Sequence, residues 1–236
     1  MASRDASRQV GPRGSLAIRI GPCPQLGGTV FADARLPDWK GNRMSKAALI
    51  VVDVQRDFCE GGVLAAADTL SLLKPLQEFI QSARRAGAVT VYTQDWHPPD
   101  HNSFQSNGGP WPVHCVANTP GAQIMAPLKP EAEDIIIHKG VTADGAGYSG
   151  FESTGLAKRL KELKIERLAV SGIATEYCVR ATALDGIQAG FEITVLTDMI
   201  RAVQPSETPR VLTELSQSGA KPTAAPEWIK SLQRRD

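Results

Sequence analysis

The feature that most constrains the fold of this chain is a repeated alternation of short apolar runs with amphipathic segments. Strands are expected over 47–53, 88–94, 134–138, 167–172 and 192–198, and helices over 69–86, 152–163, 175–189 and 206–218. Strands that alternate with helices form βαβ units. The sequence therefore predicts an α/β fold with three layers, a doubly wound and mostly parallel sheet, and helices on both faces. The chain after Gly219 adds at most a short edge strand and a terminal helix near 227–232.

The first 43 residues differ from the rest of the chain. They are rich in Gly, Pro, Ser and Arg and have few periodic apolar positions. Their basic residues are not followed by an apolar stretch long enough for a secretory signal. We therefore expect a disordered extension over 1–43 and a single domain over 44–236, beginning at Met44 in MSKAALIVVD.

Charge and cysteine content narrow the function classes. The net charge is +1 and the sequence pI about 7.7, which gives no reason to expect nucleic acid or an anionic membrane as a partner. No apolar run approaches the roughly 20 residues of a membrane-spanning helix. The four cysteines show neither close pairing nor metal-finger spacing, which favours a reducing, cytoplasmic location. A homo-oligomer remains compatible with these features.

Reactive side chains stand at the ends of the predicted strands. Asp53 ends the first strand, Asp95 and His97 follow the second, Lys139 follows the third, and Cys178 lies just beyond the fourth. In open parallel sheets, ligands bind outside the carboxyl ends of the strands. These side chains are therefore expected to converge on one crevice.

Cys178 is the candidate nucleophile. The segment SGIATEYCVRATALDG reads as strand, tight turn and helix, which places Cys178 in the first helical turn. Helix N-termini lower a thiol pKa and offer N–H groups to an oxyanion. A free cysteine is also a common small core residue, and the nearby Asp53 tips the balance toward catalysis. Asp53 would then act as general base and Lys139 would stabilise the charged groups, although each alone also fits a purely structural role.

The long loop after the second strand carries candidate metal ligands. Asp95 and His97 are two residues apart, so their side chains point the same way in an extended chain. His114 in GGPWPVHC could supply a third ligand, with His101 as a spare candidate. Asp and His ligands with open positions suit a divalent ion such as Zn²⁺, Mn²⁺ or Fe²⁺. Asp-x-His spacing alone is a weak signal, however, and a single histidine more often forms only core or surface hydrogen bonds.

Aromatic residues lie close to these positions in the sequence. Phe58, Trp96 and Tyr148 could form the walls of a slot for a flat heteroaromatic ring. From the sequence alone, ordinary core packing is the better explanation for each of them.

Taken together, these motifs resemble those of a known family. The chain from about Ala47 to Ser218 is similar to the nicotinamidase (pyrazinamidase) branch of the isochorismatase-like hydrolases. The matching stretches are VVDVQRDF followed by Gly61–Gly62, TQDWHPPDHNSF, GGPWPVHCV, the lysine of HKG followed by YSGF, and SGIATEYCVRATALDGIQAGF. They cover nearly all of the predicted domain and leave out residues 1–43.

The resemblance implies an activity and a role for each matching residue. It implies hydrolysis of nicotinamide to nicotinate and ammonia in NAD salvage, through a cysteine thioester, with pyrazinamide as a further substrate. It implies one bound divalent ion, with Zn²⁺ preferred over Mn²⁺ and Fe²⁺. The implied residues are a triad of Asp53, Lys139 and Cys178; metal ligands Asp95, His97 and His114; an oxyanion hole of the Ala174 and Cys178 N–H groups beside a cis peptide at Ile173–Ala174; and pocket residues Phe58, Trp96 and Tyr148.

Other readings of the same fold are less consistent with these residues. Isochorismatase-type members lack the nucleophilic cysteine and the metal ligands, and N-carbamoyl amidases keep the triad but usually not the metal ligands. A non-catalytic binding protein on this fold should have lost at least one member of the triad. A metal-binding protein without amidase activity stays open, because fold alone does not decide function.

Overall fold

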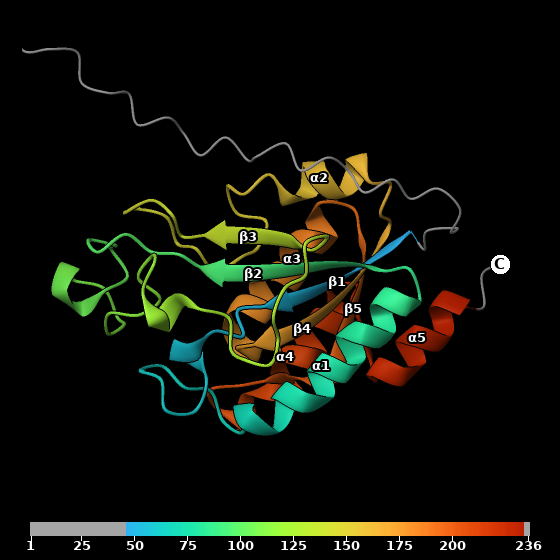
Figure 1. Cartoon of the computed structure of the whole chain (residues 1–236), viewed down its shortest axis with the longest axis horizontal. Coiled ribbons are helices and arrows are strands. Elements are labelled where there is room, and N and C mark those ends of the chain that lie inside the picture. The colour runs from blue at the N-terminus through green and yellow to red at the C-terminus, as the bar shows by residue number, and fades with distance from the viewer. Residues whose placement is uncertain (1–45, 234–236) are drawn as a thin grey trace, which may run out of the picture. The chain divides into compact units, whose positions relative to one another are not determined.

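A computed structural model describes residues 46–233, which are built around one parallel sheet (Figure 1). Its six strands lie in the order β3-β2-β1-β4-β5-β6, and every neighbouring pair is parallel. The order reverses direction at β1 and β4, which defines a doubly wound sheet. The strands are β1 (Ala47–Val52), β2 (Val89–Asp95), β3 (Ile135–Lys139), β4 (Arg167–Ile173), β5 (Glu192–Arg201) and β6 (Lys221–Thr223).

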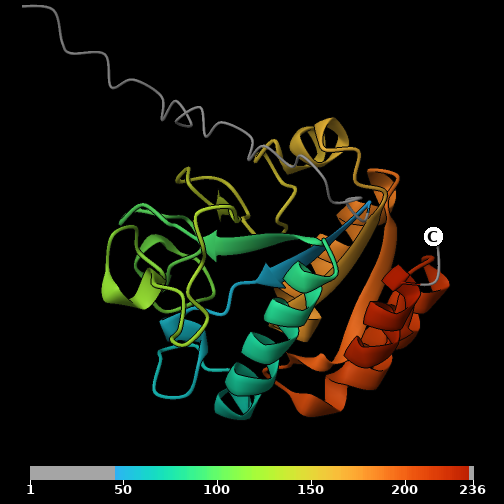
Figure 2. The ribbon, with the colours of Figure 1, turned by 45° about the vertical axis from the view of Figure 1, so that its right-hand side comes forward.

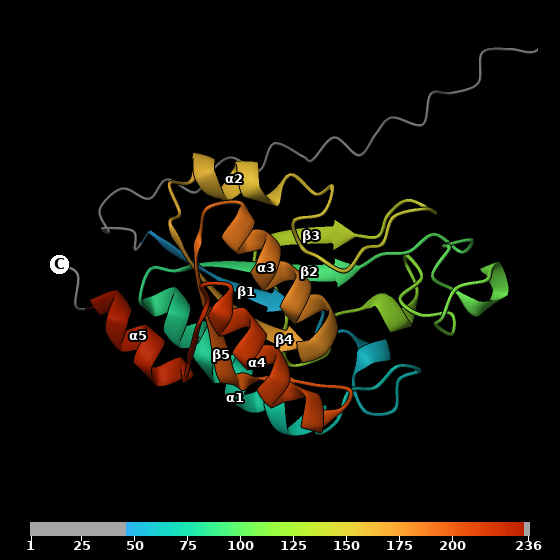
Figure 3. The ribbon, with the colours of Figure 1, turned by 180° about the vertical axis from the view of Figure 1, so that it is seen from behind.

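Helices cover both faces of the sheet. Figure 1 shows α1 and α5 on one face, and the view from behind in Figure 3 shows α2, α3 and α4 on the other. Two separate clusters of buried apolar side chains fill the spaces between these layers. The helices are α1 (Thr69–Arg85), α2 (Leu156–Glu162), α3 (Arg180–Gln188), α4 (Thr208–Gln217) and α5 (Ala225–Gln233).

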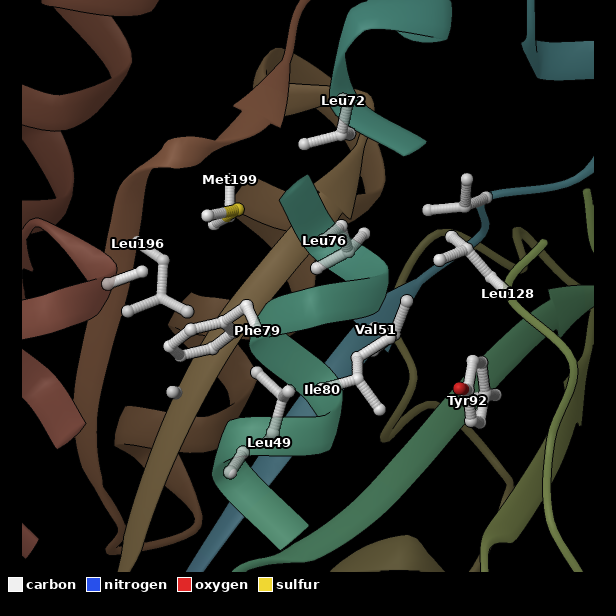
Figure 4. Close-up of a cluster of buried hydrophobic side chains, with 14 of the residues drawn as sticks. Leu49, Val51, Leu72, Leu76, Phe79, Ile80, Tyr92, Leu128, Leu196 and Met199 are labelled. Carbon is white, nitrogen blue, oxygen red and sulfur yellow. The ribbon is translucent and has the colours of Figure 1, made fainter. Parts of the chain in front are cut away.

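The α1 helix shows how the sequence builds one of these layers. Its apolar residues recur at intervals of three and four, so they form one stripe along the helix. Figure 4 shows Leu72, Leu76 and Phe79 of α1 in one cluster of buried side chains with Leu49 and Val51 of β1. Every residue of β1 is buried because the strand is covered from both sides.

The carboxyl ends of β1, β2 and β3 carry long loops. Figure 2 shows these loops gathered beyond the arrowheads of the strands, at the left of the view. The register pairs Asp95 with Lys139 and Val52 with both Thr93 and Gly172. The residues that directly follow these strands are therefore held side by side at one edge of the sheet.

The architecture agrees with the sequence prediction, and the differences are local. The segment 152–154, predicted as helix, forms turns, and α2 begins after Gly155, whose φ of +72° is left-handed. The segment before α3 is a π-helical turn rather than the first turn of an α-helix. Strand β5 continues to Arg201, and the ambiguous end of the chain forms β6 and α5. The expectation for residues 1–43 lies outside the described residues.

None of the helices described between residues 46 and 233 is both long and apolar enough to cross a membrane.

Gly172 lies where β4 passes close to the backbone of β1. Its φ is +109°, and a Cβ there would lie 2.1 Å from the carbonyl oxygen of Val52. We expect Gly172→Ala to add overpacking of roughly 1–3 kcal/mol to the left-handed strain of about 1–2 kcal/mol. Gly190→Ala is the matched control, because its φ is +89° with nothing within 4 Å of a Cβ. Urea unfolding measures both, and equal losses of stability would contradict the close approach.

Candidate active site

The centre of the site is the ammonium group of Lys139, which is buried at the end of β3. Its Nζ lies 2.8 Å from Asp53 Oδ2 and forms a second ion pair with Asp95. It donates a hydrogen bond to the Gly147 carbonyl at 2.6 Å and lies 3.4 Å from Cys178 Sγ. One cation thus joins two carboxylates, a thiol and a loop carbonyl.

Burial and this cation together set the ionisation of the group. Burial alone would lower the pKa of Lys139, but the carboxylates of Asp53 and Asp95 outweigh it and raise the pKa well above its ordinary value. Burial raises the pKa of Asp53 and that of Cys178, in each case against the opposing pull of Lys139. For Asp95, Lys139 and His97 overcome burial and lower the pKa. The pKa values of the two carboxyl groups are therefore shifted in opposite directions, which is the pattern of an ion-binding group beside a proton acceptor.

Cys178 lies in the π-helical turn η4 (Thr175–Val179), between β4 and α3. The turn is marked by the Val179 N–H, which donates to the Ala174 carbonyl five residues earlier. The peptide bond between Ile173 and Ala174 is cis, as expected, and both Ala174 and Cys178 line the same pocket. One side-chain atom from each of Asp53, Asp95 and Cys178 lies within 4.8 Å of the other two.

The residues Asp95, His97 and His114 form a second cluster beside the first. One ligand atom from each lies within 4.8 Å of the others. His97 Nδ1 donates to the Gly140 carbonyl at 2.9 Å, and His114 Nδ1 donates to the Pro112 carbonyl at 2.7 Å. In both rings the lone pair is therefore left on Nε2, the atom available for a metal. Burial lowers the pKa of His114, which favours the neutral ring that a metal requires. The donor set fits a divalent ion.

His101, the spare metal candidate, lies next to this cluster but outside it. Its ring centre is 4.0 Å from that of His97, and its Nδ1 lies 2.7 Å from Ser103 Oγ. Burial lowers the pKa of His101. Its position supports the ring of His97 from one side.

A pocket of about 280 Å³ opens onto both clusters. Its volume is close to the lower end of the range for small-molecule sites. The Trp111 indole N–H donates to the Tyr148 hydroxyl at 3.0 Å, and the Tyr148 and Tyr177 rings are stacked with centres 6.2 Å apart. The walls thus combine aromatic rings with small and aliphatic side chains. They include Phe58, Trp111, Tyr148 and Tyr177, with Cys178 and His114 reaching the same space.

Trp96 is placed differently from the sequence expectation. It does not line the pocket but stacks on His138, with ring centres 4.2 Å apart and planes 4° apart. The reason is the alternation of side chains in extended chain, because Asp95 and His97 point toward the pocket and the residue between them points away. Trp111 is the tryptophan that faces the pocket.

The structure brings together the other residues singled out in the sequence. The three residues of the expected triad and the three expected metal ligands meet at one edge of the sheet, and Phe58 and Tyr148 line the pocket beside them. Sequence reasoning missed Trp111 and Tyr177. Their signal was proximity in the chain, because Trp111 stands three residues before His114 and Tyr177 directly precedes Cys178.

Comparison with known families identifies the class of protein to which this parallel α/β fold and its strand-end cysteine belong. Residues 47–227 match the family described as Isochorismatase domain, and the chain belongs to this family. It is 35% identical over 208 residues to the nicotinamidase of Escherichia coli K12, covering 78% of this chain and 98% of the relative.

Two solved structures are similar in fold as well as in sequence. The pyrazinamidase of Pyrococcus horikoshii in complex with zinc is 45% identical, with a TM-score of 0.73 and coverage of 76% of this chain and 99% of that one. PnC1 from L. infantum in complex with nicotinate is 34% identical, with a TM-score of 0.71 and coverage of 77% and 94%.

The three described cysteines should differ in reactivity toward iodoacetamide. Cys178 lines the pocket, whereas Cys59 and Cys115 are fully buried, and burial raises the pKa of Cys59 to about 11. Burial raises the pKa of all three thiols, but only Cys178 is reached from the pocket, so we expect it to be alkylated at least about tenfold faster than either. Peptide mapping by mass spectrometry measures the three rates. Faster labelling of Cys115 than of Cys178 would contradict this geometry.

Proposed function

We propose that this protein is an amidohydrolase that converts nicotinamide to nicotinate and ammonia, a reaction of pyridine nucleotide salvage, and that it also accepts pyrazinamide. The observation that carries the proposal is the position of Lys139 Nζ, 2.8 Å from Asp53 and 3.4 Å from the Sγ of Cys178, which lines a pocket with several aromatic side chains. A nucleophile, a proton acceptor and a fixed cation are thereby in contact. The nicotinamidase, pyrazinamidase and nicotinate-bound relatives support the choice of substrate.

The first half of the reaction forms a thioester on Cys178. Asp53 accepts the thiol proton, and the sulfur attacks the carboxamide carbon of the substrate. The backbone N–H groups of Ala174 and Cys178 are assigned to the oxyanion of the tetrahedral intermediate. Asp53 then returns the proton to the amide nitrogen, the C–N bond breaks, and ammonia leaves.

The second half regenerates the thiol. Asp53 takes a proton from a water molecule, which attacks the thioester carbon, and the C–S bond breaks to release nicotinate. The proton then returns to the sulfur of Cys178. Lys139 keeps its proton throughout, since the carboxylates raise its pKa, and its charge stabilises the anions formed beside it.

A divalent ion is assigned to Asp95, His97 and His114, with Zn²⁺ as the first choice because a relative was crystallised with zinc. When bound, such an ion supplies a Lewis acid that can hold the pyridine nitrogen of the substrate. Phe58, Trp111 and Tyr148 would enclose the flat ring.

The free thiols of the described cysteines support a reducing, cytoplasmic location for the enzyme.

Ammonia release from nicotinamide by the purified full chain tests the proposal. We expect steady release that falls after chelation and returns when Zn²⁺, Mn²⁺ or Fe²⁺ is added back, because the substrate is held through the ion. Release that is unaffected by complete removal of metal would refute the metal assignment. No release from protein with a full metal complement would refute the amidase.

Two variants should separate the nucleophile from the metal ligands. Cys178→Ala should lose turnover by roughly 10⁴-fold or more, since residues of a catalytic triad act as a unit, and it should keep its metal. His114→Ala should lose metal and weaken substrate binding. Ammonia assays and metal analysis on the same samples give both readouts. Normal turnover in the first variant, or normal metal content in the second, would contradict these roles.

A further inference from the structure

The side chain of Gln55 is fully buried and forms hydrogen bonds with the backbone of Asp95. Its Nε2 donates to the Asp95 carbonyl at 2.8 Å, and its Oε1 accepts from the Asp95 N–H at 2.8 Å. A further bond runs from Nε2 to the Ala122 carbonyl at 2.9 Å. Strand β1 has already ended at Val52, so the amide of Gln55 continues the pairing that the strand no longer provides.

Asp57 makes a comparable contact with a different loop. Its Oδ2 accepts a hydrogen bond of 2.8 Å from the backbone N–H of Cys115, the residue that follows His114. The carboxylate also rests against Gly121, where a Cβ would lie 2.1 Å from Oδ2. The loop that carries His114 is thus attached to the segment that follows β1.

We propose that Gln55 and Asp57 are positioning residues that hold Asp95 and His114 in the geometry of a divalent metal site. The inference rests on the metal site of the proposed function. Asp95 and His114 come from separate segments, and one short segment contacts the backbone of the first and the chain beside the second. Because a metal site tolerates little displacement of its ligands, these contacts control affinity without touching the ion.

Gln94 provides a matched control for Gln55. It is also a buried glutamine, and its Nε2 donates to the same Ala122 carbonyl at 2.8 Å. Among the described residues its side chain makes no hydrogen bond to the Asp95 backbone. Substitution by Met, which is similar in length and apolar, removes a buried amide at either position. Only at position 55 does it also release Asp95.

The experiment compares Gln55→Met with Gln94→Met in the full chain. Binding of Zn²⁺ and Mn²⁺ is measured by competition with a chromophoric chelator, and thermal unfolding is measured on the metal-free proteins. We expect Gln55→Met to bind both ions about 10- to 100-fold more weakly than the unsubstituted chain. The metal affinity of Gln94→Met should stay within about twofold of that of the unsubstituted chain, because Gln55 still holds Asp95. Equal metal affinity in the two variants would overturn the role of Gln55.

A second pair of variants acts on the other ligand and covers the case in which Gln55→Met does not fold. Asp57→Asn keeps an oxygen that can accept from the Cys115 N–H, whereas Asp57→Leu does not. We expect Asp57→Leu to lose metal affinity by about tenfold or more and Asp57→Asn to retain most of it. Identical affinities for these two variants would overturn the role of Asp57.

The readouts keep this inference separate from the proposed function. Failure of the unsubstituted, metal-loaded chain to release ammonia would refute the amidase and leave the metal affinities to be judged by themselves. Retained affinity in both Gln55→Met and Asp57→Leu would refute the inference while the amidase stands. In folded variants that are saturated with metal, kcat should recover more fully than KM, because the positioned ligands do not react.

Discussion

The site depends on one buried charge. Burying an ammonium group away from water is costly unless the group is paired. Lys139 is paired with Asp53 and Asp95, and it also donates a hydrogen bond to a loop carbonyl. Two carboxylates share this cation, but only Asp95 also has His97 beside it. Asp95 is held as an anion, and the pKa of Asp53 is raised. Burial outweighs the cation at Asp53, whereas His97 adds to the cation's effect at Asp95, so one carboxylate is suited to bind an ion and the other to exchange a proton with Cys178.

The sheet explains why this arrangement could be predicted from the sequence. Lys139 and Asp95 are direct partners in the β2–β3 register, and Asp53 follows the neighbouring strand β1. Parallel strands bring their carboxyl ends to one edge whatever lies between them in the chain. The apolar runs that predict the strands thus also predict which polar residues meet. Cys178 obeys the same rule through β4, although a π-helical turn, rather than an α-helix, presents it.

The loops were harder to predict because no strand register constrains them. Trp96 was assigned to the pocket for its nearness to Asp95, yet period-two alternation turns it onto His138. Trp111 and Tyr148 meet through a hydrogen bond between two loops far apart in the chain, and no sequence period records such a contact. The hydrogen bonds from Gln55 to Asp95 could not be predicted from the sequence either. Predicting them would require the end of β1, the reach of the glutamine side chain and the position of the loop at Ala122 to be known together.

One loop links the nucleophile to the metal ligands. The segment after β3 gives the Gly147 carbonyl to Lys139 and the Gly140 carbonyl to His97. These glycines pack so closely that a Cβ on Gly147 would lie 2.8 Å from Gly140 Cα, and one on Gly140 would lie 2.4 Å from the His97 ring. Because larger side chains would separate the two carbonyls from their donors, the loop fixes the tautomer of His97 and the position of Lys139 at once. The orientation of the metal-binding imidazole and that of the catalytic cation are therefore set by the same backbone.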